Sequence, residues 1–307
     1  MAGKNFTFDN IPDLSGKVAL VTGANVGIGY ITARELARKK AHVFVCARNI
    51  EKGQSAVATI KAETGNELVE FLQLDLLSLK NIKEAADKFM ARGLGLHILI
   101  NNAGIMATPF NLSADGIEAQ FATNHIGHFL LLPALEKSAP SRIVVVSRYN
   151  VEDLAHRVFA PRKGIDFENI NAKNLSIWTR YGQSKLANVL FANELDRRVK
   201  DKKIYVNSLH PGVVKSNLMQ GLKLSWGSWV AAYTAIQNLF SLSTEDGALT
   251  QLYVATSPDI EINNFRGRHF MPIAKLGAMS AKAMDENLAK ELWDYSEKII
   301  KERVGSD

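Results

Sequence analysis

Residues 17–29 constrain the fold of this chain more than any other stretch. They read Lys-Val-Ala-Leu-Val-Thr-Gly-Ala-Asn-Val-Gly-Ile-Gly, so an unbroken apolar run passes through closely spaced glycines, and helical periodicity follows over 30–39. This order predicts a buried strand, a tight turn and a helix. A strand that feeds a helix through glycines is the arrangement that holds the pyrophosphate of a dinucleotide.

The glycines of this turn have separate tasks. Gly23 permits a sharp exit from the strand, Gly27 lets the backbone approach a pyrophosphate, and Gly29 lets helix and strand pack closely. Asn25 and Ile28 lie among them, at the helix N-terminus that faces the phosphates. The spacing is G-x-x-x-G-x-G rather than the commoner G-x-G-x-x-G, and a simple turn is the alternative. Its place between the first strand and a helix favours the cofactor cradle.

The residue that follows the second strand indicates which cofactor binds. This buried strand covers 41–47 and ends at Arg48, at the point where the adenosine ribose is recognised. An acidic residue there would bind a free 2′-hydroxyl, but none is present. Arg48, with Lys52 one turn into the next helix, instead offers positive charge for a 2′-phosphate. We therefore expect NADP(H), with an ordinary surface arginine as the alternative.

Strand and helix patterns continue to alternate along the chain. Helices are predicted at 51–64 and 79–92, and strands at 68–74 and 97–100. The residues that follow these strands are Asp75 and Leu76, and then Asn101, Asn102, Ala103 and Gly104. Such alternation predicts an α/β fold, a doubly wound (Rossmann) parallel sheet with helices on both faces. Ligands bind beyond the carboxyl ends of such strands, so all these residues are expected to converge.

Tyr181 and Lys185 stand one helical turn apart, so their side chains share a face. A free tyrosine has a pKa near ~10, too high for efficient proton exchange at neutral pH. A neighbouring ammonium group favours the phenolate, and the same lysine would hold the nicotinamide ribose hydroxyls. The pair is therefore a candidate acid and its electrostatic partner.

Together these features resemble the short-chain dehydrogenase/reductase superfamily. The resemblance rests on the glycine turn, the strand-terminal Asp75, the Asn101–Gly104 segment and the Tyr181/Lys185 pair, and it runs from about 17 to at least 255. Residues 181–193 (YGQSKLANVLFAN) and 210–214 (HPGVV) look most like the branch of retinol dehydrogenases and the WW-domain-containing oxidoreductase.

The resemblance implies an oxidoreductase that transfers hydride between NADP(H) and a carbonyl or alcohol substrate. It implies that Asn124, in a helix predicted over 116–134, bends that helix through a bound water and links the lysine to solvent. After a strand at 205–209, it implies that Pro211 and Gly212 support the nicotinamide and that Val214 lies near its carboxamide.

One position departs from the family pattern. A strand predicted at 142–146 is followed by Ser147 and Arg148, where the family has two serines of which the second is catalytic. Successive strand side chains point to opposite faces, so Ser147 replaces its neighbour only if the strand end bulges. Ser147 is the candidate for contact with the substrate oxygen. The alternative is a catalytically impaired sensor or interaction protein that binds NADP(H).

We expect a single Rossmann-type domain over 1–307, with 149–179 and 215–243 as substrate-side insertions. The apolar and aromatic residues of 218–242 favour a lipophilic substrate, and a subunit interface or contact with a membrane surface are the alternatives. Further on, a helix is predicted over 245–255, a short strand over 268–270 and a last helix over 281–303.

Composition and charge bear on nucleic-acid binding, cellular location and metal binding. The net charge of +6 is scattered, without the clustering that nucleic-acid binding requires. Cys46 is the single cysteine, no apolar run is long enough to cross a bilayer, and residues 1–15 lack the apolar core of a signal peptide, so a reducing, cytoplasmic location is expected. His125 and His128 share a helical face, but without a third ligand nearby we expect no metal.

Overall fold

A computed structural model describes residues 3, 5–132, 141–147, 161–171, 173–214 and 241–304. One eight-stranded sheet has the order β3-β2-β1-β4-β5-β6-β7-β8, and only the last pair is antiparallel. Its strands are β1 (Val18–Thr22), β2 (His42–Ala47), β3 (Val69–Gln73), β4 (Ile98–Asn101), β5 (Ser141–Val146), β6 (Ile204–Leu209), β7 (His269–Met271) and β8 (Lys275–Leu276). This is the doubly wound parallel sheet that the sequence predicts, and the strand order reverses between β1 and β4.

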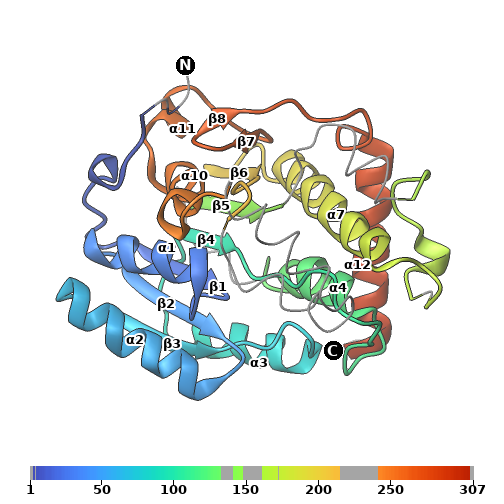
Figure 1. Ribbon diagram of the computed structural model, residues 1–307, viewed down its shortest axis with the longest axis horizontal. Helices are drawn as coiled ribbons and strands as arrows, with labels where there is room; N and C mark the ends of the chain where they lie inside the picture. Colours follow the sequence, from blue (N-terminus) through green and yellow to red (C-terminus); the bar gives the residue numbers. More distant parts are fainter. Residues whose placement is uncertain are drawn as a thin grey trace.

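Helices cover both faces of the sheet (Figure 1). On one face lie α1 (Gly27–Arg38), α2 (Ile50–Thr64) and α10 (Thr244–Thr256). The other face carries α3 (Leu79–Met90), α4 (Ala119–Phe121), α5 (Gly127–Phe129), α7 (Ile177–Arg198) and α12 (Glu286–Val304). The short pieces are η1 (Phe8–Asn10), η2 (Ala122–Ile126), η4 (Phe167–Asn169) and α11 (Asp259–Ile262).

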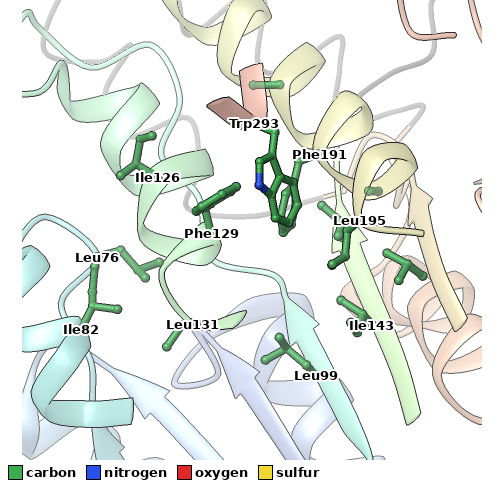
Figure 2. Close-up of a cluster of buried hydrophobic side chains, with 14 of the residues drawn as sticks. Leu76, Ile82, Leu99, Ile126, Phe129, Leu131, Ile143, Phe191, Leu195 and Trp293 are labelled. Atoms are coloured by element: carbon green, nitrogen blue, oxygen red, sulfur yellow. The ribbon is translucent and has the colours of Figure 1, made fainter. Parts of the chain in front are cut away.

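The two faces of the sheet carry two separate hydrophobic cores. Along β1, Val18 and Leu20 belong to one core and Ala19 and Val21 to the other, because side chains alternate along a strand. Figure 2 shows the first core, where Phe129 and Phe191 meet Trp293 of α12. This packing holds α7 against α5 and α12.

The helix predicted over 116–134 has a different start and is not continuous. The structure begins it at Ala119, and Glu118 caps it by accepting a hydrogen bond from the amide of Phe121. Residues 122–126 then form a π-helical turn, and residues 133–134 lie outside the described part. Single π-helical turns inside an α-helix are rare, so a helical pattern in sequence predicts a continuous α-helix.

The insertion predicted over 149–179 ends earlier than expected. Helix α7 begins at Ile177 because the Ser176 side chain accepts a hydrogen bond from the Thr179 amide, which caps the helix. The last helix, predicted from 281, starts later, at Glu286. The short strand β8 has no counterpart among the predicted strands. Residues 149–160 and 172 of the first expected insertion and residues 215–240 of the second lie outside the described residues, and so does Arg148.

Candidate functional site

The carboxyl ends of β1 and β4 are joined through the hydroxyl of Thr22. Its Oγ1 accepts hydrogen bonds from the amides of Asn102 and Ala103, both at 2.9 Å, and the Asn102 side-chain amide donates to the Thr22 carbonyl at 2.8 Å. Two segments 80 residues apart in sequence are therefore one unit. The glycine turn and the Asn102–Gly104 loop converge as the sequence predicts.

The glycine turn has the geometry of a phosphate cradle. Gly23 and Gly27 adopt positive φ angles of 65° and 62°, which residues other than glycine rarely adopt. A Cβ on Gly29 would lie 2.4 Å from the Asn102 side-chain nitrogen, so only glycine fits this close approach. No side chain in the described part caps the N-terminus of α1, which leaves its first amides for an anion. These residues fit the pyrophosphate of a dinucleotide.

Basic, exposed residues follow β2, and an acidic residue follows β3. The side chain of Arg48 is exposed directly after β2, and Lys52 is exposed one turn into α2. Asp75 follows β3 and its carboxylate accepts a hydrogen bond from the Leu77 amide at 3.0 Å. Leu76, predicted as a cofactor contact, places its side chain in the hydrophobic core instead, so only its backbone remains for such a contact.

Helix α7 brings Tyr181 and Lys185 to the same crevice. The Lys185 ammonium lies 5.9 Å from the centre of the Tyr181 ring and donates to the Val146 carbonyl, at the end of β5, at 3.2 Å. A Cβ on Gly104 would lie 3.3 Å from Lys185 Nζ and 3.1 Å from Asn124 Oδ1. The predicted lysine, asparagine and glycine therefore meet at one point.

Asn124 stands in the π-helical turn and is held by three hydrogen bonds. Its Oδ1 accepts from the Ile105 amide at 2.8 Å, and its Nδ2 donates to the Ile105 carbonyl at 3.0 Å and to Ser184 Oγ at 2.8 Å. Ser184 in turn donates to the Tyr181 carbonyl at 2.8 Å. Sequence reasoning missed Ser184, although its place directly before Lys185 puts it beside the pair.

Ser147 points to α7 and is only 1% exposed. Its hydroxyl donates to the Lys185 backbone carbonyl at 2.8 Å. The alternation along β5 explains this direction, because Ile143 and Val145 also face the α7 side while Val144 and Val146 face away. The single hydroxyl proton of Ser147 is therefore used inside the protein, and contact of this residue with substrate stays a prediction.

The turn after β6 also reaches the cradle, through helix α10. Gly212 has a φ of 91°, and the backbone of Val214 pairs with Leu242. A Cβ on Gly247 of α10 would lie 2.5 Å from the Val214 side chain and 3.0 Å from that of Ile28. Gly247 thus allows Val214 and Ile28 to approach each other. A glycine inside a helix is the sequence signal that could have identified this contact.

A second group that sequence reasoning missed lies at the first turn of α7. The Arg180 guanidinium and the Glu118 carboxylate form an ion pair at 3.3 Å, with side chains 3% and 1% exposed. Gln120 accepts from the Ala107 amide at 3.0 Å and donates to the Ile177 carbonyl at 3.3 Å. These bonds fix the loop after β4 against the first turn of α7. They join residues far apart in sequence, so no local pattern predicts them.

The two histidines that share a helical face, His125 and His128, have partners other than a metal. His125 bonds Ser296 of α12 at 2.8 Å, and His128 bonds Thr22 at 2.9 Å. Burial lowers the pKa of His125 to about 3 and that of His128 to about 4, so both are neutral near pH 7. Within the described ranges, no group of three or more histidine, cysteine, aspartate or glutamate side chains could hold a metal ion.

Known proteins share both the sequence and the fold. The family model for the short chain dehydrogenase matches residues 17–153. Human retinol dehydrogenase 11 is 40% identical across 92% of this chain and 85% of its own length. The human WW domain-containing oxidoreductase is 36% identical across 96% of this chain and 70% of its own. A crystal structure of an uncharacterized protein from Mycobacterium paratuberculosis is 32% identical, with a TM-score of 0.72 over 96% of this chain and 97% of that one.

The chain belongs to the short-chain dehydrogenase/reductase family of oxidoreductases, in the branch that contains the retinol dehydrogenases. The site described above lies where this fold binds nicotinamide cofactors. Among the helices that the structure describes, none combines the length and the apolar character needed to cross a membrane.

Proposed function

We propose that this protein is an NADP(H)-dependent oxidoreductase that transfers hydride between the nicotinamide and a lipophilic carbonyl or alcohol. One observation carries the proposal. The Tyr181 ring, Lys185 Nζ and the Asn124 side chain meet beside Gly104, next to a glycine cradle that fits a dinucleotide. A positioned acid beside a bound nicotinamide is the arrangement that reduction of a carbonyl requires.

The residues of this chain hold and move the proton of the reaction. Bound NADP(H) supplies or accepts the hydride. In reduction, the Tyr181 hydroxyl donates its proton to the carbonyl oxygen, and in oxidation the phenolate removes the proton from the alcohol. The positive charge of Lys185 favours the phenolate, and Asn124 keeps the adjoining helix turn in place for a proton relay.

Support for NADP(H) comes from Arg48 and from a relative. The exposed Arg48 guanidinium follows β2 without an acidic neighbour, and a 26% identical short chain dehydrogenase from Burkholderia cenocepacia was solved in complex with NADP, with a TM-score of 0.64 over 86% of this chain and 98% of that one. A guanidinium binds a phosphate through two parallel hydrogen bonds. The 2′-phosphate is the group that distinguishes NADP(H) from NAD(H).

The variant Arg48→Gln tests this cofactor preference. We expect the Kd for NADPH to rise about 10–100-fold, because hydrogen bonds to a charged group contribute ~1.5–3 kcal/mol. The Kd for NADH should change by less than about twofold, since NADH has no phosphate for Arg48 to contact. Fluorescence titration measures both constants, and Arg303→Gln on α12 is the control with the same charge change. An equal loss for both cofactors would contradict the assignment of Arg48 to the 2′-phosphate.

A lipophilic substrate is supported by the side chains around Tyr181. Met106 and Ala107 pack with the Tyr181 ring in a small apolar cluster, joined by the partly buried Ile177 and Trp178. Apolar walls with a few polar groups are typical of pockets for apolar ligands. The relative human retinol dehydrogenase 11 is named for retinol, which is a lipophilic alcohol. The apolar residues of 218–242, predicted to cover the substrate, lie mostly outside the described part.

The proposed function is tested by NADPH consumption with purified protein. We expect oxidation of NADPH with at least some lipophilic members of a panel of long-chain aldehydes, aromatic aldehydes, small polar aldehydes, ketones and quinones. Activity with polar aldehydes alone would contradict the lipophilic substrate class. No consumption across the whole panel would contradict the enzymatic function.

The second candidate function is binding of NADP(H) without turnover, and the position of Ser147 favours it. Its hydroxyl proton is used by the Lys185 carbonyl, so it offers no free donor for a developing oxyanion. Arg148 occupies the family's serine position in sequence but lies outside the described residues. Turnover that appears only in Arg148→Ser, with unchanged NADPH affinity, would favour this candidate. Equal turnover in parent and variant would exclude it.

A further inference from the structure

His128 lies between the cofactor cradle and the π-helical turn that carries Asn124. Its side chain is 1% exposed, its Nε2 is 2.9 Å from Thr22 Oγ1, and its Nδ1 is 3.1 Å from the backbone carbonyl oxygen of Asn124. One imidazole ring therefore spans the distance between β1 and the catalytic helix turn. Neither the sequence motifs nor the proposed proton transfer assigns it a role.

The hydrogen-bond partners determine where the proton of His128 sits. The Asn124 carbonyl can only accept, so Nδ1 carries the hydrogen and Nε2 of the neutral ring is an acceptor. The Thr22 hydroxyl already accepts from the amides of Asn102 and Ala103. Its own proton therefore goes to His128 Nε2 at 2.9 Å rather than to the Ile100 carbonyl at 3.3 Å. The Thr22 hydroxyl then uses both lone pairs and its proton, and the His128 ring uses both of its nitrogens.

A second proton on this ring would break the chain of hydrogen bonds. It would sit on Nε2 and face an oxygen whose two lone pairs are already occupied by amides. Burial lowers the pKa of His128 to about 4, and the positive charge of Lys185 acts in the same direction. His128 is thus a neutral ring that accepts from the Thr22 hydroxyl and donates to the Asn124 carbonyl.

The two hydrogen bonds of the His128 ring lead to two different parts of the candidate site. On the Thr22 side, the hydroxyl that bonds His128 also fixes the loop that begins at Asn102. On the Asn124 side, the same residue holds Ile105 and Ser184, and Ser184 reaches the Tyr181 carbonyl. Through these hydrogen bonds the imidazole connects the loop at the cradle with the helix that carries Tyr181.

We propose that His128, as the neutral Nδ1–H tautomer, is a positioning residue that couples the dinucleotide cradle to the turn beside Lys185 and Tyr181. The catalytic half of this inference rests on the proposed function. The tautomer and the contact with the cradle do not, so their tests need no turnover.

The tautomer is tested directly by ¹⁵N NMR of the protein with labelled histidine. We expect the His128 ring to show a protonated Nδ1 and an unprotonated Nε2 at pH 7, with His128→Gln used to assign the signals. An Nε2–H tautomer or a doubly protonated ring at pH 7 would overturn the proposal, because in neither form can Nε2 accept the hydroxyl proton of Thr22.

Three variants of His128 test its hydrogen bond to Thr22 and its hydrogen bond to Asn124 separately. His128→Asn keeps a donor at the position of Nδ1 and loses the acceptor for Thr22, so the Kd for NADPH should rise about 5–50-fold with kcat within about twofold. His128→Gln keeps an acceptor at the position of Nε2 and loses the donor to Asn124, so kcat should fall about 5–50-fold with the Kd within about twofold. His128→Leu should show both losses.

The control is His42→Gln, because His42 of β2 pairs with Glu70 of β3 at 2.7 Å and lies outside the π-helical turn. We expect this control to change neither parameter by more than about twofold. Equal losses of both parameters in the Asn and Gln variants of His128 would show a merely structural role and overturn the coupling. A parent without turnover would contradict the proposed function, while the nitrogen signals and the NADPH affinities would still decide the role of His128.

Discussion

Replacing Tyr181 with phenylalanine is expected to lower kcat/KM for carbonyl reduction by about 10²–10⁴-fold and to leave the Kd for NADPH within about twofold. The ring is buried among Met106 and Ala107, so phenylalanine keeps the packing and removes only the hydroxyl. The loss therefore reports the proton transfer and not the fold. Steady-state kinetics and fluorescence titration with NADPH measure the two quantities.

The control for this variant is Tyr253→Phe. Tyr253 is also buried, and its hydroxyl donates to the Asp259 carboxylate at 3.0 Å, away from the site. Its removal should lower the free energy of unfolding by ~1–2 kcal/mol and leave kcat unchanged. If Tyr181→Phe kept more than about a tenth of the parental kcat/KM, another group would be the acid and the role of Tyr181 would be wrong.

The largest effect on stability is expected from Arg180→Met. This change leaves the Glu118 carboxylate without its partner, and burial already raises the pKa of Glu118. Removing one member of a buried ion pair costs ~3–5 kcal/mol of unfolding free energy. The double variant Glu118→Gln/Arg180→Met should recover part of this loss, because no buried charge is then left unpaired. Urea unfolding followed by tryptophan fluorescence measures the whole cycle.

The exposed pair between Lys290 and Asp294 of α12 is the control. Its atoms are 2.6 Å apart, but the two side chains are 66% and 53% exposed. Lys290→Met should therefore change the free energy of unfolding by less than ~1 kcal/mol. Additive losses in the Glu118/Arg180 cycle, or a loss from Arg180→Met no larger than that from Lys290→Met, would show that the buried pair is not coupled.

The parts of the fold that sequence predicts are those with local causes. Apolar runs such as 18–21 are strands because every side chain in them is buried, and the positive φ angles of the turn at Gly23 and Gly27 need glycine. Strand alternation also predicts that Ser147 and its neighbour face opposite sides. The direction of Ser147 follows this rule, since it points to α7.

The parts that sequence does not predict depend on contacts between distant residues. The π-helical turn at Asn124 is held by Ile105, which lies 19 residues earlier, and the Arg180–Glu118 pair spans two elements. Residue type alone does not reveal such partners, because each side chain would be equally acceptable on a solvated helix. The burial of the Leu76 side chain has the same origin, since it packs against Gly127 of α5.

The central claim is hydride transfer from NADPH that depends on Tyr181, and deuterium labelling tests it most directly. The parent protein is incubated with NADPH deuterated at nicotinamide C4, on either face in separate samples, and with a lipophilic aldehyde from the panel. We expect the alcohol product to carry one deuterium from one of the two labelled cofactors, and Tyr181→Phe to form product at least about 100-fold more slowly. An NADPH-binding parent that transfers no deuterium from either label to any member of the panel would contradict the account.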